Sequence, residues 1–240
     1  MEVVQACPVL AEMFETGETR AADGSAMAIH SHIPLPYADA LFRTVRNLRP
    51  QACVEIGLAL GTSALAILVG LEAAGGEGRL ISIDPKQNDK WRGAGRAAIE
   101  RAGYAHRHEL LVEPDYSALP ALLRIGLRVD FGYIDGWHTF DHAMLDFWFI
   151  DRMMPAGGVV AFNDCGLAGV DKAIGFVQSH RKYEEMNVGL PIDYGQLGRA
   201  RLLGRLLRGR TRGLKMRQHQ DRYFRKVEDW QAPWDFYAPF

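Results

Sequence analysis

The stretch Val54-Glu-Ile-Gly57-Leu-Ala-Leu-Gly61-Thr-Ser63 decides the fold. An apolar run ends at two glycines and leads into a second apolar segment, residues 62–74, which has helical length. Glycine lets the backbone turn tightly and approach a ligand, which then faces the N–H groups at the start of the helix. The stretch therefore predicts a strand, a glycine loop and a helix, in that order.

Strand-like and helical runs alternate along the chain after this stretch. Apolar runs predict strands at 52–56, 79–84, 109–113, 129–135 and 158–163, with helices at 62–74, 91–102, 116–125, 139–153 and 169–181. Strands that are apolar almost throughout, each followed by a helix, are typical of a parallel sheet covered on both faces. Two weaker strands, at 185–188 and 222–227, bring the count to seven.

The predicted fold is therefore α/β and Rossmann-like. It is a doubly wound, mostly parallel seven-stranded sheet with a closing antiparallel hairpin and an N-terminal helical cap. We expect residues 1–49 to form the cap or substrate lid, 50–195 the ligand-binding core, 196–220 a basic amphipathic hairpin extension, and 221–240 the last strand and the C-terminal tail. A helix at 37–48 belongs to the cap.

Composition limits the class of protein. Of the 240 residues, 48% are hydrophobic and 24% are charged, which suits a globular chain and excludes disordered or collagen-like classes. Three scattered cysteines are too few for a disulfide framework or a zinc knuckle. The N-terminus has no basic segment ahead of an apolar stretch, and no apolar run has the length of a membrane span. We expect a soluble, cytoplasmic protein.

The charge is distributed unevenly. The formal net charge is -1, from 28 Lys and Arg against 29 Asp and Glu. Eight bases and no acid lie between Asp193 and Asp221, namely Arg199, Arg201, Arg205, Arg208, Arg210, Arg212, Lys215 and Arg217. Without them 20 bases face 29 acids, so an acidic body carries a basic arm, residues 199–217.

In open α/β sheets, ligands bind beyond the carboxyl ends of the strands. The second strand ends at Asp84, 27 residues after Gly57, where a carboxylate can accept both hydroxyls of a ribose. The loop lacks the pattern G-x-G-x-x-G, which argues against NAD or FAD and favours S-adenosylmethionine (SAM). The alternative is that glycines in the first turn and an acid after the second strand are common to any βαβ unit.

Four motifs follow one another along the chain. They are Val54-Glu-Ile-Gly57 with Gly61-Thr-Ser63, Ile81-Ser-Ile-Asp84-Pro85, Tyr133-Ile-Asp-Gly-Trp-His-Thr-Phe-Asp-His142, and Met154-Pro-Ala-Gly-Gly-Val-Val160. Together they resemble the class I SAM-dependent methyltransferases, in particular the macrolide-sugar and catechol-type O-methyltransferases, over residues 40–190. The resemblance implies an enzyme that uses SAM to methylate a hydroxylated small molecule, such as a sugar or a secondary metabolite.

The resemblance also implies which residues bind the cofactor. The glycine loop holds the methionine part of SAM, Asp84 binds the ribose, and the segment after the third strand flanks the adenine. The expected cofactor-binding residues are Glu55, Gly57, Gly61, Ser63, Asp84, Asp115, Ser117 and Asp135. For Ser117 the alternative is that it and Tyr116 only cap the following helix.

A metal site is implied in the same way. Metal-dependent members place an Asp after strand four and an Asp-Asp or Asp-Asn pair after strand five around Mg²⁺, and these positions are Asp135 and Asn163-Asp164 here. Hard oxygen ligands suit Mg²⁺, which would hold substrate oxygens and lower the pKa of the reacting hydroxyl. Asn163 departs from the pattern because its oxygen is neutral. The alternative is that Asp135 caps the helix near Thr139 and Asp164 binds backbone amides in a turn.

His138 lies three residues after Asp135 and is the expected general base, with Asp135 as the second catalytic residue. The sugar methyltransferases often have an acid two residues after the metal-binding Asp, and Trp137 stands there in this chain. The alternative for His138 is a structural bond to a backbone carbonyl. His30 and His32, ahead of Pro34, are expected either to touch the substrate or to be solvated.

The basic arm leaves other functions open. Its arginines recur at helical spacing opposite leucines, which is typical of an amphipathic helix on an anionic membrane surface and would make the protein peripheral to a membrane. A mobile, solvated hairpin is the alternative. An RNA methyltransferase or a binding module recruited through the arm is a further possibility, but the arm lacks aromatic residues for base stacking, so nucleic acid is disfavoured. Homo-oligomerisation is left open.

Overall fold

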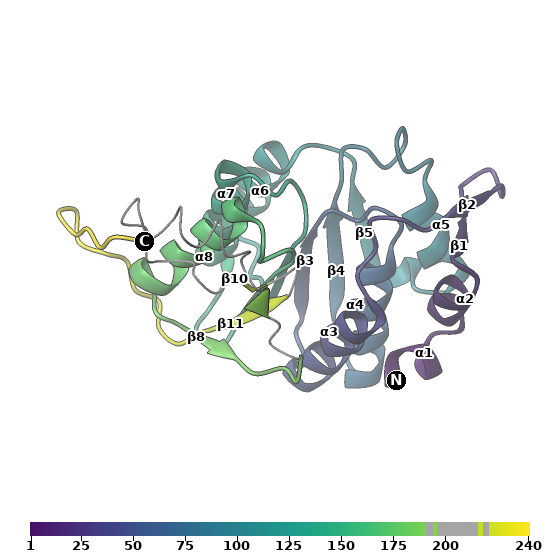
Figure 1. Ribbon diagram of the computed structural model, residues 1–240, viewed down its shortest axis with the longest axis horizontal. Helices are drawn as coiled ribbons and strands as arrows, with labels where there is room; N and C mark the ends of the chain where they lie inside the picture. Colours follow the sequence, from purple (N-terminus) through teal and green to yellow (C-terminus); the bar gives the residue numbers. More distant parts are fainter. Residues whose placement is uncertain (191–193, 196–215, 218–220) are drawn as a thin grey trace.

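A computed structural model describes residues 1–190, 194–195, 216–217 and 221–240 (Figure 1). Seven strands form one sheet in the order β5-β4-β3-β6-β7-β11-β8. The strands are β3 (Ala52–Ile56), β4 (Arg79–Ile83), β5 (His108–Leu111), β6 (Phe131–Ile134), β7 (Val159–Phe162), β8 (Tyr183–Met186) and β11 (Arg222–Lys226). Six of these strands run in the same direction, and β11 runs in the opposite direction between β7 and β8. The predicted sheet and its closing antiparallel hairpin are confirmed.

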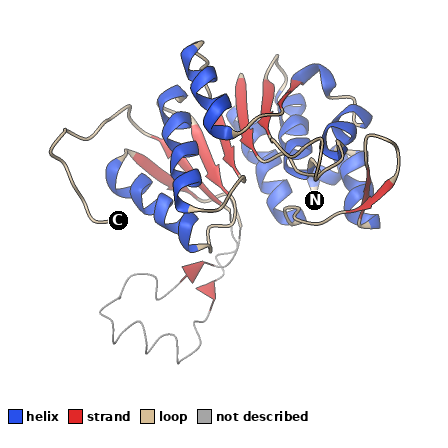
Figure 2. Ribbon diagram, turned by 90° about the horizontal axis from the view of Figure 1, so that it is seen from above, coloured by secondary structure: helices blue, strands red, loops and turns tan. Residues whose placement is uncertain are grey.

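Helices cover both faces of the sheet, as Figure 2 shows from above. One face packs against α3 (Leu35–Leu48), α4 (Thr62–Ala74) and α5 (Ala94–Arg101), and the other against α6 (Asp115–Arg124), α7 (Phe140–Met153) and α8 (Ala168–His180). A single 3₁₀ turn, Ala105–Arg107, precedes β5. Two separate apolar clusters result, one on each side, which is the doubly wound arrangement that the sequence predicts.

The central helix α4 is buried along most of its length because α3 lies over it. Such a helix has no polar face, which is why its sequence is apolar on every side. A Cβ atom at Gly70 would lie 2.9 Å from the carbonyl oxygen of Phe42 on α3. Glycine at this position therefore permits the close approach of the two helices.

The N-terminal cap contains α1 (Glu2–Ala6), α2 (Pro8–Thr16) and a small hairpin of β1 (Glu18–Arg20) and β2 (Ala26–Ala28). The sequence did not predict this hairpin, because its three-residue strands are too short to show alternation. The hairpin turn donates a backbone hydrogen bond from Ala22 to the carbonyl of Arg92, which follows β4. The cap therefore reaches over the segment that follows the second strand of the core.

The predicted basic extension, residues 196–220, lies outside the described residues apart from one short strand, which pairs with another just before the extension. These are β9 (Tyr194–Gly195) and β10 (Met216–Arg217), which pair antiparallel. Among the helices that the structure describes, none combines the length and apolar character needed to cross a membrane.

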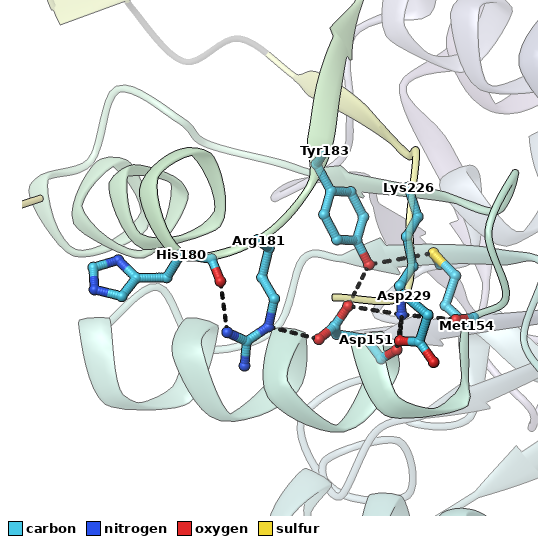
Figure 3. Close-up of polar contacts among 7 residues, drawn as sticks. All are labelled: Asp151, Met154, His180, Arg181, Tyr183, Lys226 and Asp229. Carbon is cyan, nitrogen blue, oxygen red and sulfur yellow. Dashed lines mark hydrogen bonds and ion pairs between the residues drawn. The ribbon is translucent and has the colours of Figure 1, made fainter. Parts of the chain in front are cut away.

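The last strand is fixed to α7 by a buried polar cluster (Figure 3). Lys226 donates from Nζ to the carbonyl oxygens of Asp151 at 2.7 Å and Met154 at 2.9 Å, and it lies 3.1 Å from the Asp151 carboxylate. Tyr183, at the start of β8, donates to the same carboxylate at 2.8 Å. These bonds hold the edge strand β8 and its neighbour β11 against the C-terminal end of α7.

Candidate active site

Polar residues from three adjacent strands line up at the carboxyl edge of the sheet. Ile134, Phe162 and Arg222 are register partners across β6, β7 and β11. Asp135 and Asn163 follow the first two of these residues. Because β11 is antiparallel, the residue that precedes it, Asp221, lies at the same edge. Asp135, Asn163 and Asp221 therefore form one polar row at this edge, and the sequence predicted the first two as site residues.

The glycine loop approaches this row from β3. Gly57 has a φ of 94°, and a Cβ atom there would lie 2.3 Å from the carbonyl oxygen of Asp135. A side chain would also strain this backbone, so only glycine fits both requirements. The loop thus passes directly over the start of the segment that holds Asp135.

Asp84 lies beside the loop, as predicted, and also holds it in shape. Its Oδ2 accepts hydrogen bonds from the Ala59 amide at 2.8 Å and from Gln87 Nε2 at 3.2 Å. Gln87 also donates to the Ala59 carbonyl at 2.9 Å and accepts from the Gly95 amide at 3.2 Å. Gln87 is a residue that sequence analysis missed, because nothing in its motif distinguishes it from a surface glutamine.

Glu55 and Ser63 meet beneath the loop. Glu55 is fully buried, and its carboxylate accepts from Ser63 Oγ at 2.5 Å and from Ser82 Oγ at 2.7 Å. Burial raises the pKa of Glu55 to about 7, against the opposing effect of these two hydroxyls. The two side chains that we expected to bind cofactor therefore bind each other and support the loop from below.

A second polar group lies where α6 and α7 meet. Asp115 accepts from His142 Nδ1 at 2.8 Å, and the fully buried Asp146 lies beside it. Burial, together with the charge of Asp115, raises the pKa of Asp146 well above its usual value. By contrast, Ser117 donates from Oγ to Glu113 at 2.6 Å near the surface. The structure thus joins Asp115 to two α7 residues and separates its side chain from that of Ser117.

His138 lies close to two acids, Asp135 of the polar row and Asp164, which follows Asn163. Its Nε2 is 3.4 Å from Asp164 Oδ2 and 4.0 Å from Asp135 Oδ1. Burial lowers the pKa of His138, and the charge of Asp164 opposes this effect. The pKa shift favours a neutral imidazole near pH 7, which is the form that accepts a proton.

Asp221 is the acid that sequence analysis missed. It is 3% exposed and accepts from Asn163 Nδ2 at 2.8 Å and from the Tyr133 hydroxyl at 3.1 Å. Burial raises its pKa to about 7. Asp135 has a raised pKa as well, because of burial and then because of the charges of Asp221 and Asp164. The only sequence signal for Asp221 was its position directly before an antiparallel strand.

The other candidate residues lie around this edge or in the cap. The ring of His30 packs 5.4 Å from that of Trp91, and the ring of His32 packs 5.9 Å from that of Phe14. Trp91 is only 7% exposed, whereas Trp137, next to His138, is 67% exposed. The cap histidines thus contact aromatic rings, and Trp137 is exposed to solvent beside His138 in the sequence.

Comparison with known proteins identifies this arrangement. A family model described as a methyltransferase domain matches residues 54–165, a span that contains the glycine loop, Asp84 and the acids that follow the fourth and fifth strands. Over this span the chain is similar to methyltransferases. A comparison with curated protein sequences gives no match.

Solved structures of methyltransferases share the fold over nearly the whole chain. An O-methyltransferase from Bacillus cereus in complex with SAH (S-adenosylhomocysteine) is 15% identical with a TM-score of 0.66, covering 91% of each chain. TomG from Streptomyces achromogenes, an O-methyltransferase of tomaymycin synthesis in complex with SAM, is 15% identical with a TM-score of 0.63, covering 94% of this chain and 89% of TomG. SAH-bound PaMTH1 from Podospora anserina is 17% identical with a TM-score of 0.61, covering 92% and 88%.

Proposed function

We propose that this methyltransferase transfers the methyl group of SAM to a hydroxyl group of a small molecule, such as a sugar or a secondary metabolite. The observation that carries the proposal is the position of His138, whose Nε2 lies within 4.0 Å of both Asp135 and Asp164 beside the glycine loop. The similar folds of two O-methyltransferases, one of them in tomaymycin synthesis, also support it.

The residues of the edge fit SAM. The backbone at Gly57 comes so close to the Asp135 carbonyl that no Cβ atom fits, so glycine keeps the turn after β3 tight. Asp84, directly after β4, already accepts from the Ala59 and Lys86 amides and from Gln87 Nε2, and its carboxylate has about four acceptor positions, so a ribose hydroxyl can still donate to it. When bound, SAM supplies an electrophilic methyl group on a positively charged sulfur. The carboxylates of the polar row favour a positive charge at this edge.

The reaction requires the protein to align the reactants and to remove one proton. His138 Nε2 accepts the proton of the acceptor hydroxyl, and Asp164 stabilises the imidazolium that forms. The oxygen then gains the methyl group as the carbon–sulfur bond breaks, and the sulfur keeps the bonding electrons. Alignment of the reactants and removal of one proton account for the whole reaction.

Assistance by Mg²⁺ is a prediction from the resemblance, and the side chains as they stand do not fit it. A cation bridging Asp135 and Asp164 would compete with the His138 imidazole for the same carboxylates. We therefore propose that methyl transfer continues in EDTA, and a strict requirement for added Mg²⁺ would contradict this.

The test of the proposed function is methyl transfer from labelled SAM to a panel of hydroxylated sugars and aromatic metabolites. We expect the wild type to label at least one acceptor on oxygen. His138→Ala is expected to lower kcat about 10²- to 10⁴-fold, the range for loss of a general base, with SAH binding unchanged. His106→Ala, at an exposed histidine bonded to the Gly103 carbonyl, is the matched control. Full activity of His138→Ala, or transfer to nitrogen or to RNA instead, would contradict the proposal.

A further inference from the structure

We infer that Asp221 is a positioning residue that sets the orientation of the Asn163 amide, so that Asn163 presents its oxygen to a second hydroxyl of the acceptor. The inference rests on the proposed function. It assigns a role to a residue outside the predicted motifs, contributed by the last strand of the sheet.

The sheet places Asp221 beside Asn163. Arg222 and Phe162 are register partners in the antiparallel pair of β11 and β7, so the residues at 221 and 163 are neighbours across the strands. Neighbouring strands lie about 4.8 Å apart, so side chains on one face of adjacent strands come into contact. Asp135 is the corresponding neighbour of Asn163 on the other side. Asn163 thus lies between two acids.

The hydrogen bonds fix which end of the amide faces Asp221. The group that contacts Asp221 Oδ1 at 2.8 Å is the NH₂ of Asn163, which donates to the carboxyl oxygen. The carboxylate is itself held by the Tyr133 hydroxyl, which donates to Oδ2 at 3.1 Å. Asp221 and Asn163 are 3% and 7% exposed, so water cannot readily replace these bonds. The Asn163 carbonyl oxygen consequently points away from Asp221.

The orientation matters for the acceptor. The proton of the reacting hydroxyl goes to His138, so Asn163 Oδ1 is left to accept a hydrogen bond from another hydroxyl of the same molecule. A reversed amide would present NH₂ to that hydroxyl and remove an acceptor. Asp221 therefore favours polyhydroxylated acceptors over analogues that lack one hydroxyl, because the latter leave a buried carbonyl unpaired.

The experiment compares Asp221→Asn with the wild type on methyl glycosides and their mono-deoxy analogues. The amide introduced at position 221 can donate as well as accept, so the Asn163 amide is free to reverse in this variant. We expect KM for the fully hydroxylated acceptor to rise about ten-fold, with kcat and the Kd for SAH within two-fold of the wild type. The preference over the mono-deoxy analogue is expected to disappear. Asp235→Asn, at an exposed acid in the C-terminal tail, is the matched control.

A second variant separates positioning from a general loss of structure. Asn163→Asp combined with Asp221→Asn exchanges the two groups, so that a carboxylate oxygen faces the acceptor whichever way the introduced amide turns. We expect this pair to restore KM and the preference for the extra hydroxyl. An unchanged KM in Asp221→Asn would overturn the inference, and so would equal losses of SAH binding and acceptor binding. A wild type that methylates no glycoside would instead overturn the proposed substrate class, and with it the inference that rests on it.

Discussion

Glu55 shows how much a single residue contributes to this site. It lies on β3 directly before the glycine loop, yet its carboxyl is bonded to Ser63 and Ser82 inside the protein. Its pKa is raised to about 7 by burial. The folded protein therefore holds this proton to a higher pH than the unfolded chain, in which an exposed glutamate titrates near its usual value of about 4.3.

This shift predicts a pH dependence of stability. As pH rises from about 4.5 to 7, the unfolded chain loses the proton first, so the Glu55 contribution is complete at low pH and declines across that window. A shift of this size corresponds to roughly 3 kcal/mol. In urea unfolding of the ligand-free protein, Glu55→Gln should lose less stability than the wild type between pH 4.5 and 7.5.

The exposed Glu184→Gln should behave like the wild type in the same experiment. If the stabilities of Glu55→Gln and the wild type changed with pH in the same way, the buried carboxyl would not be the cause of the pH dependence.

At the residue scale, the sequence predicted positions better than contacts. Strand ends and motif spacing were sufficient to bring Asp84, Asp135 and His138 to one edge. The side-chain direction of Glu55 depends on packing against β4, which the motif does not encode. Asp221 and Gln87 were missed for a related reason, since both act on segments that are distant in sequence and are joined only by the folded sheet.

Among the strands of the sheet, the last two are the least hydrophobic, so their sequences indicate a buried strand least clearly. β8 (Tyr183–Met186) and β11 (Arg222–Lys226) are polar, so their patterns were the weakest in the chain. What fixes them is the cluster around Asp151, in which Lys226 satisfies two backbone carbonyls at the end of α7. The central strands were easier to predict from the sequence, because they are buried on both faces and their residues are apolar almost throughout.

This cluster gives an element-scale prediction. Lys226→Met keeps the length of the side chain but leaves the Met154 carbonyl without its donor and the Asp151 carbonyl with only the Met154 amide, at about 1–3 kcal/mol for a buried group left unsatisfied. We expect the free energy of unfolding to fall by roughly 2–4 kcal/mol. Lys182→Met, at an exposed lysine next to β8, is the control and should change stability by less than about 0.5 kcal/mol. Equal stabilities for the two variants would show that the cluster is dispensable.

Across the whole molecule, the near-zero net charge of -1 combines two unlike parts. Acids gather at the ligand edge, where Asp84, Asp135 and Asp164 follow the carboxyl ends of three strands. The compensating bases lie in the basic arm, most of which is outside the described residues. Its attraction to an anionic membrane surface stays a prediction, and so does any homo-oligomer.

The overall fold was predictable because alternating strands and helices leave few arrangements, and the strand order places all polar strand ends together. The N-terminal hairpin was not, since its strands are three residues long. The acceptor itself is specified by the shape and hydrogen bonding of the site, which a linear motif reports only in part.

The most direct test of the account is calorimetric titration of the intact chain with SAH. We predict one site with a Kd in the micromolar range for the wild type and for Gly175→Ala, where a Cβ atom meets only ordinary contacts. Gly57→Val, whose side chain would collide with the Asp135 carbonyl, should show no binding while remaining folded. Absence of SAH binding by the wild type, or undiminished binding by Gly57→Val, would contradict the account.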